Sequence, residues 1–309
     1  MKAPCLSILI YHRVLARPDP LFPGEVDARL FQRQLRLLRR CCTPLPLPEA
    51  LRRLRDGSLP PRAACITFDD GYADNAQQAL PLLLRHGMHA TFFIATGYLD
   101  GGRMWNDSVI DGVRQARGPV LDLREHGLGC LAVGSLAQRR AAIDALLGRL
   151  KYLPFAQRQH LAEQIRRRAG AADGAPPMLS SQQLRQLQQA GMAIGAHTHR
   201  HPILATLSER AARNDIADGK RRLEDLLQAP VSLFAYPNGK AGHDYGPRHV
   251  DIVRSLGFSA AVATDWGVAR PGPGLDPYQL PRFTPWDRGR LAFLWRLRQN
   301  TLRARPDGP

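Results

Sequence analysis

Residues 65–72 read Cys65-Ile66-Thr67-Phe68-Asp69-Asp70-Gly71-Tyr72, an apolar run that ends in two adjacent carboxylates and a glycine. The apolar half predicts a buried strand, and a backbone turn at its end can direct both carboxylates into one cleft. Two carboxylates this close do not comfortably stay ionised together without a nearby cation. A metal ligand beside a general base satisfies that condition. An ordinary turn is the alternative, because Asp-Asp-Gly also favours turns.

Outside this stretch, the chain alternates short apolar runs with amphipathic segments. This alternation predicts an α/β protein with a parallel sheet flanked by helices. Polar residues follow successive strands, which favours a barrel with its site at the carboxyl ends of the strands. Strands are expected at residues 5–14, 63–68, 90–95, 192–196, 231–235 and 259–263, and helices at 27–40, 48–55, 75–85, 180–190, 208–228 and 247–256.

Residues 104–176 follow a different pattern, which is helical at 107–116, 135–150 and 157–169. We interpret them as a helical insertion within a single catalytic domain that spans residues 1–287. Residues 288–309 predict a basic helix or tail, in which arginines alternate with Leu, Phe and Trp. Such a segment can lie on an anionic bilayer. A last helix packed on the barrel with a solvated arginine face is the alternative.

The composition is strongly basic, with 43 Lys and Arg against 27 Asp and Glu and a net charge of +16. Such an excess suits a polyanion or an anionic membrane surface, but no nucleic-acid-binding module is recognisable. No apolar run approaches the length of a membrane span, and the first residues lack a secretory signal pattern. We interpret the five cysteines as buried thiols in a reducing compartment. We therefore expect a cytoplasmic protein, peripheral at the inner membrane face if its C-terminal helix binds there.

His197 and His201 lie four residues apart, directly after the strand expected at 192–196. Zinc-binding histidine pairs have this spacing, although it is also frequent by chance. Two imidazoles and one carboxylate from another strand end form a ligand set with open positions for water and a substrate oxygen. The sequence therefore contains a candidate divalent metal site.

Three motifs resemble those of the polysaccharide deacetylases of the NodB-homology type, carbohydrate esterase family four, over roughly residues 5 to 285. The motifs are Thr67-Phe68-Asp69-Asp70-Gly71, His197-Thr198-His199-Arg200-His201 and Phe234-Ala235-Tyr236-Pro237-Asn238-Gly239. The resemblance implies a distorted (β/α) barrel and a divalent metal, with zinc as the default ion. It also implies that Asp69 is the general base and that Asp70, His197 and His201 hold the metal.

Two departures from the family pattern concern the groups around the base. Ala235 stands where the family's third motif has an arginine that orients the base, and Arg282 is a candidate substitute. The late Leu-x-His motif that supplies the catalytic acid is absent. In the poly-N-acetylglucosamine deacetylase branch that histidine belongs to a Tyr-His pair on the first strand, and Tyr11-His12 fits this pattern. We therefore assign His12 as the acid; a strand-end histidine bonded to the backbone is the alternative.

Secondary candidates surround this predicted centre. A backbone N–H near Tyr236 and Pro237 is expected to help the metal hold the oxyanion. Asp265 and Trp266 follow a strand and can orient His12 or line a sugar cleft, and Trp105 can stack on a sugar ring; simple packing is the alternative for each.

The expected activity is removal of N-acetyl groups from a sugar in a glycan or a lipid-linked exopolysaccharide precursor. An O-acetyl esterase or a small-amide hydrolase with the same site is one alternative, because the same activated water attacks either carbonyl. A catalytically silent glycan- or nucleic-acid-binding protein is another. Retention of Asp69 together with all three ligands argues against silence.

Overall fold

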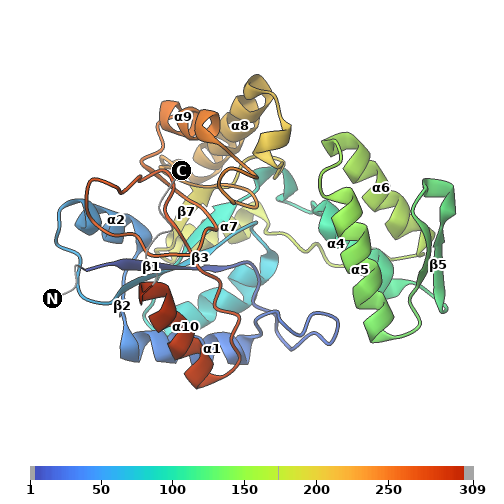
Figure 1. Ribbon diagram of the computed structural model, residues 1–309, viewed down its shortest axis with the longest axis horizontal. Coiled ribbons are helices and arrows are strands. Elements are labelled where there is room, and N and C mark those ends of the chain that lie inside the picture. The colour runs from blue at the N-terminus through green and yellow to red at the C-terminus, as the bar shows by residue number, and fades with distance from the viewer. Residues whose placement is uncertain (1–3, 173, 303–309) are drawn as a thin grey trace. The chain divides into compact units, whose positions relative to one another are not determined.

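The computed structural model describes residues 4–172 and 174–302. The chain divides into two compact units (Figure 1). Residues 18–24 and 101–177 make the second unit, and the rest of the chain makes the first. Each unit has a hydrophobic core of its own. The sequence predicted a catalytic domain at residues 1–287 and a C-terminal segment at 288–309. These domain boundaries stay a prediction.

The first unit is built on a seven-stranded sheet with the neighbour order β1-β3-β4-β7-β8-β9 and with β2 beside β3. All of these strand pairs are parallel. Strands β1 and β3 are buried along their whole length, as expected of parallel strands covered on both faces. The strands are β1 (Leu6–Tyr11), β2 (Thr43–Pro44), β3 (Ala63–Phe68), β4 (Thr91–Ile94), β7 (Ala193–Ala196), β8 (Leu233–Ala235) and β9 (Ala260–Val262).

Residues 280–283 connect the two edge strands of the sheet. The Leu280 N–H donates to the Ala261 carbonyl of β9, and the Leu280 carbonyl accepts from the Ala263 N–H. On the other side, the Phe283 N–H donates to the Ile8 carbonyl of β1. The segment therefore closes the curled sheet and places residue 282 between its first and last strands. The barrel class predicted from the sequence is confirmed.

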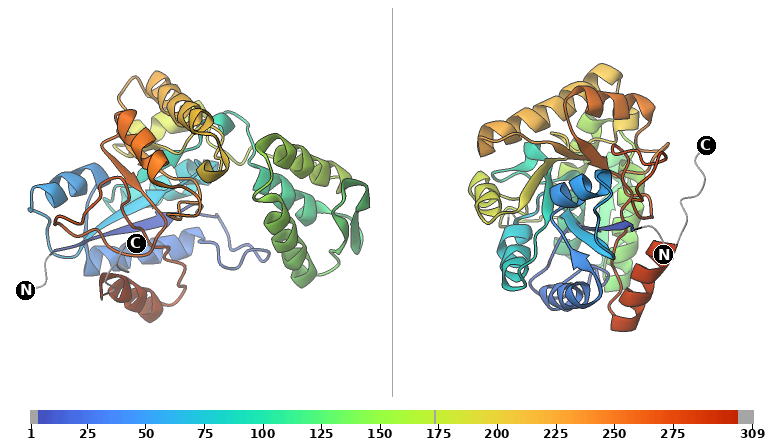
Figure 2. Two further views of the ribbon diagram at one scale, coloured as in Figure 1. Left: turned by 45° about the horizontal axis from the view of Figure 1, so that its top comes forward. Right: turned by 90° about the vertical axis from the view of Figure 1, so that its left-hand side faces the viewer.

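Helices pack around this sheet (Figure 2). Asp27 caps α1 as predicted, because its carboxylate accepts the N–H groups of Arg29 and Leu30. The helix expected at 75–85 begins instead with a π-helical turn, in which the Leu80 N–H donates to the Asn75 carbonyl. The helices are α1 (Ala28–Cys41), α2 (Leu47–Arg55), η1 (Asn75–Ala79), α3 (Leu80–Arg85), η2 (Thr96–Tyr98), α7 (Ser181–Gln189), η4 (Leu204–Thr206), α8 (Glu209–Leu227), α9 (Pro247–Ser255) and α10 (Arg290–Leu302).

The second unit contains the three helices expected in the insertion and a hairpin that was not predicted. The hairpin strands are short, and their buried residues Leu121 and Leu123 are too few to reveal a period of two. The elements are α4 (Trp105–Gln115), β5 (Val120–Leu123), η3 (Arg124–His126), β6 (Gly129–Ala132), α5 (Leu136–Leu150) and α6 (Phe155–Arg168).

The C-terminal helix expected at 288–309 is observed as α10, and residues 303–309 lie outside the described part. Within the described residues, no helix combines the length and apolar character that a membrane crossing requires. The prediction of buried cysteines is wrong for four of the five. Only Cys65 is buried, whereas Cys130 is exposed and the other three are partly exposed. All five thiols are free.

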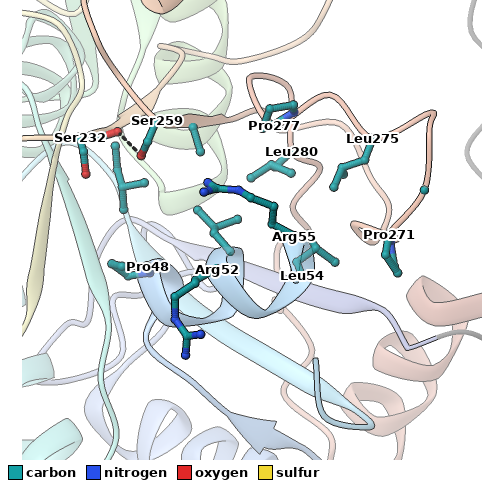
Figure 3. A pocket seen from close by; sticks show the side chains of 14 residues that line it. Pro48, Arg52, Leu54, Arg55, Ser232, Ser259, Pro271, Leu275, Pro277 and Leu280 are labelled. Carbon is teal, nitrogen blue, oxygen red and sulfur yellow. Dashed lines mark hydrogen bonds between the residues drawn. The ribbon is translucent and has the colours of Figure 1, made fainter. Parts of the chain in front are cut away.

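A cavity of about 360 Å³ lies at the amino ends of β8 and β9 (Figure 3). Ser232 and Ser259, which precede these strands, line it together with Arg52 and Arg55 of α2 and residues of the loop 271–280. The aspartates and histidines singled out by the sequence follow the carboxyl ends of their strands. This cavity is therefore at the opposite end of the sheet from the candidate site.

Candidate active site

Three side chains converge at the carboxyl ends of β3 and β7. The Nε2 atoms of His197 and His201 lie 3.4 and 3.3 Å from Oδ1 of Asp70, and 3.1 Å from each other. A tetrahedral zinc ion with ligand distances of about 2.0–2.1 Å separates its ligand atoms by about 3.3 Å. Among the described residues, these three form the one group of metal-ligating side chains with such spacing. The donor set therefore fits a divalent metal ion.

The surroundings of this cluster also favour a cation. Nδ1 of His197 lies 2.8 Å from the Ala235 carbonyl, so Nδ1–H donates there and Nε2 keeps its lone pair for the cluster. Within the described part of the chain, Oδ1 of Asp70 is buried and accepts no hydrogen bond, an arrangement that is costly unless a cation satisfies it. Burial would raise the pKa of Asp70, but His201, His197 and His12 outweigh burial and hold that pKa well below its usual range.

Asp69 pairs with Arg282, the residue offered above as a candidate substitute for the family's arginine. Nη1 and Nη2 of Arg282 donate to the two carboxylate oxygens of Asp69, each at 2.7 Å. Nε of Arg282 donates to the Ala263 carbonyl at 2.8 Å, and the side chain is fully buried. Burial would raise the pKa of Asp69, but Arg282, with smaller contributions from His197 and His12, lowers it overall. The result is an ionised, oriented carboxylate whose Oδ2 lies 4.0 Å from Nε2 of His197.

His12 follows β1 and lies close enough to lower the pKa of both Asp69 and Asp70. His12 is exposed to solvent, and its imidazole makes no hydrogen bond within the described part of the chain. Its backbone carbonyl accepts from Nδ2 of Asn75 at 2.9 Å, which fixes the strand end. The His12 imidazole is therefore accessible to solvent and near the two buried carboxylates.

Tyr236 does not offer its own N–H to a substrate. That N–H donates to the Val262 carbonyl at 3.2 Å, and the buried ring stacks on Tyr245 with 3.8 Å between centroids. Pro237, which follows, has no N–H. The next backbone N–H, that of Asn238, has no acceptor among the described residues, and Asn238 has a φ of 59°. The expected oxyanion role of a backbone N–H in this loop stays a prediction, and among the described residues the Asn238 N–H has no acceptor that would prevent it.

The remaining sequence candidates have other contacts. The Asp265 carboxylate accepts from the Ala241 N–H at 3.2 Å and makes no hydrogen bond to His12 among the described residues. Trp266 packs edge-on against Phe283, with the Arg296 guanidinium over its ring. Trp105 belongs to the second unit, where the Arg158 guanidinium lies 5.0 Å from its ring centroid. Their roles toward a sugar stay predictions.

The loop that carries both histidines is clamped onto α8 by Asp215, which the sequence analysis did not single out. The Asp215 carboxylate, almost fully buried, accepts the N–H groups of His199 and Arg200, both at 2.9 Å, and Nε of Arg200 at 2.6 Å. Asp215 lies on the apolar face of the predicted helix 208–228, next to Ile216. The sequence signal that could have identified Asp215 was a charged residue at a position where helical periodicity requires an apolar one.

Backbone strain marks both the histidine loop and the turn after β3. Asp70, Thr198 and His201 have φ values of 74°, 63° and 53°. Non-glycine residues in this region cost about 1–3 kcal/mol each and persist only where their surroundings hold them. Gly219 of α8 allows the necessary approach, because a Cβ there would lie 2.6 Å from the backbone carbon and oxygen of Thr198.

Replacing Gly219 by alanine is expected to displace the loop and to weaken the binding of a divalent metal about tenfold, as substitutions behind metal ligands typically do. Competition with a chromophoric chelator measures this affinity. Gly148→Ala is the matched control, since Gly148 is also helical but a Cβ there would have no other atom within 4 Å. Equal metal affinity in the two variants would contradict a role for the close approach of α8 to the histidine loop.

The family model described as polysaccharide deacetylase matches residues 56–261. The chain belongs to this family, as its motifs predicted. Among curated proteins, YxkH of Bacillus subtilis (strain 168), whose name carries the same family term, is 21% identical over 243 residues. That match covers 79% of the chain but only 59% of the length of YxkH.

Solved structures share the fold. The deacetylase PplD of Streptococcus pyogenes, in complex with acetate, has a TM-score of 0.60 and 21% identity over 92% of this chain and 93% of its own. IcaB of Ammonifex degensii has a TM-score of 0.62 and 21% identity over 96% of each chain. The BpsB deacetylase domain of Bordetella bronchiseptica has a TM-score of 0.56 and 16% identity over 92% of this chain and 96% of its own. The distorted (β/α) barrel of this family is therefore the fold of the chain.

Proposed function

We propose that this protein is a metal-dependent hydrolase that removes N-acetyl groups from a sugar of a glycan or of a lipid-linked precursor. The observation that carries the proposal is the buried cluster of Asp70, His197 and His201 beside the arginine-held carboxylate of Asp69. Membership of the polysaccharide deacetylase family supports a glycan as the substrate. Acetate, which PplD holds, is the acid that such a reaction releases.

Each residue of the site then has a defined task. Asp70, His197 and His201 would hold a divalent ion, which would lower the pKa of the attacking water and polarise the acetyl carbonyl. Asp69 accepts the proton of that water at Oδ2, and Arg282 keeps the carboxylate oriented. A weak base suffices here, because the water is already acidified. The His12 imidazole donates a proton to the departing amine nitrogen, and the Asn238 N–H donates to the oxyanion.

Zinc is the metal we propose, because two imidazoles and one carboxylate with open positions form a typical catalytic zinc set. Other divalent ions accept the same donors. Removal of the metal by a strong chelator is expected to lower acetate release at least 100-fold and to be reversed by added Zn²⁺. Full activity of demonstrably metal-free protein would refute metal dependence.

The test of the function is acetate release from a panel of N-acetylated glycans, lipid-linked oligosaccharides and O-acetyl esters. Release from N-acetylated sugars by the metal-loaded protein supports the proposal, whereas release from esters alone would make the protein an O-acetyl esterase. If the protein binds metal and glycan but releases acetate from no substrate, the result would favour a glycan-binding protein. Strong, steeply salt-dependent DNA binding would favour a nucleic-acid partner.

We also propose that the protein acts in the cytoplasm. The support is that all five cysteines are free thiols, as is usual in a reducing compartment. A fusion to an alkaline phosphatase reporter, which is active only outside the cytoplasm, tests this. Reporter activity from a fusion to the full chain would overturn the assignment.

A further inference from the structure

Helix α10 presents an apolar face to solvent. Leu291 is 82% exposed, Trp295 58% and Leu302 53%, and Trp286 just before the helix is 47% exposed. Spacings of four and seven residues place the three helical side chains on one side of α10. We call Leu291, Trp295 and Leu302, with Arg298 between them in the sequence, the C-terminal face; Trp286 is not part of it, because its ring contacts Trp266 and Arg296.

The opposite side of α10 anchors the helix to the protein. Phe293, Leu297 and Asn300 are buried there, and α10 packs against α1 and β1. Half of the eight large hydrophobic residues exposed in the described chain belong to residues 286–302. Such clustering is unusual for a surface that faces only water. One side of α10 therefore packs on the protein. The C-terminal face, on the other side, has no partner in the described part of this chain.

The charges around this face are positive and largely unneutralised. Helix α10 contains three arginines and no acidic residue, and Arg290 and Arg298 have no ion-pair partner in the described residues. Arg296 is paired with Asp287. The neighbouring helix α1, which lies beside α10 in both views (Figure 1, Figure 2), also lacks acidic residues. All five of its arginines are exposed, and none forms an ion pair within the described part: Arg29, Arg33, Arg36, Arg39 and Arg40.

We propose that the C-terminal face docks on an anionic lipid bilayer, with Leu291, Trp295 and Leu302 in the interfacial layer and the arginines of α10 and α1 at the lipid phosphates. Tryptophan and leucine on one side of a basic helix suit the headgroup boundary, and nearby arginines are attracted to the negative leaflet. A nucleic acid would use the arginines but would leave Leu291 and Leu302 in water. This inference concerns a surface outside the candidate active site and does not depend on the proposed reaction.

Vesicle co-sedimentation of the full chain tests the proposal without any acetylated substrate. Vesicles of phosphatidylcholine with about one quarter phosphatidylglycerol are compared with vesicles of phosphatidylcholine alone, at low and at high salt. We expect partition into the anionic vesicles that weakens, but does not vanish, at high salt, because the apolar contacts are not screened. Equal partition into both vesicle types, or none into either, would overturn the proposal.

Two sets of variants separate the apolar and the charged contributions. Leu291→Asp with Trp295→Asp is expected to weaken partition at least tenfold, and Arg290→Gln with Arg298→Gln about 25-fold, since each arginine near the surface contributes about fivefold. Leu136→Asp with Tyr152→Asp is the matched control, because these residues are exposed to a similar extent in the second unit. Thermal melting confirms that each variant is folded.

Three outcomes would contradict a bilayer as the partner. The first is equal partition of the control and the Leu291/Trp295 variants. The second is that DNA displaces the protein from anionic vesicles even when free lipid is in excess. The third is a concentration-dependent dimer in lipid-free solution that the Leu291/Trp295 variants abolish, because it would make a second copy of the chain the occupant of this face.

Discussion

Asp69→Asn is expected to lower acetate release by roughly 10²- to 10⁴-fold, the usual contribution of a positioned general base. The amide keeps the size of the side chain, and its oxygen can still accept one of the two Arg282 hydrogen bonds. Its nitrogen cannot accept a proton, and its oxygen is a very weak base. Affinity for the proposed zinc ion should change little, because the candidate ligand group of Asp70, His197 and His201 does not include Asp69. The loss should therefore fall on turnover.

The measurement pairs acetate release with a zinc titration on the same preparations. Asp122→Asn is the control, because Asp122 forms an exposed pair with Arg124 in the second unit and contacts none of the site residues. An Asp69→Asn protein that binds zinc and releases acetate at the native rate would remove Asp69 from the reaction. Loss of both zinc and activity would instead assign Asp69 to the metal site.

Arg282→Met is expected to lower the free energy of unfolding by about 3–5 kcal/mol, because it leaves the Asp69 carboxylate buried without its counter-charge. Methionine has a similar length and packs into the same space, so the loss reports mainly on the charge. The pair is fully buried, with two hydrogen bonds of 2.7 Å between guanidinium and carboxylate. Urea denaturation of metal-free protein, in which no ion compensates Asp69, measures the effect.

A double variant decides whether the uncompensated charge is the cause. Asp69→Asn combined with Arg282→Met should recover part of the loss, because no charge then remains buried. Arg254→Met is the control; its pair with Asp251 is exposed and should contribute less than about 1 kcal/mol. If the double variant is no more stable than Arg282→Met alone, the destabilisation comes from lost packing and not from the ion pair.

The local features of this chain were predictable from its sequence. Strand β3 occupies residues 63–68 as expected, because a short apolar run before Asp69 depends only on neighbouring residues. The Asp27 cap and the helix after Ser180 follow from interactions within a few residues of each helix start. The metal cluster was predicted because its members lie in short motifs that occur next to strand ends.

Other features required contacts between distant parts of the chain. Arg282 and Asp69 are separated by 213 residues, so only closure of the sheet by residues 280–283 brings them together. The exposure of Cys130 and of the C-terminal face likewise depends on which side of each element the core covers. The hairpin of the second unit was missed because so few of its residues are buried.

The sequence by itself determined the barrel class, the family, and the residues able to hold a metal, since periodicity and motif spacing are properties of neighbouring residues. Only the tertiary structure shows that Arg282, a candidate from the sequence, pairs with Asp69. It alone decided that Asp215 and Gly219 hold the histidine loop and that α10 presents Leu291 and Trp295 to solvent. These depend on burial and on pairings across long loops, whose partners are chosen by the packing of the whole chain and not by any local preference.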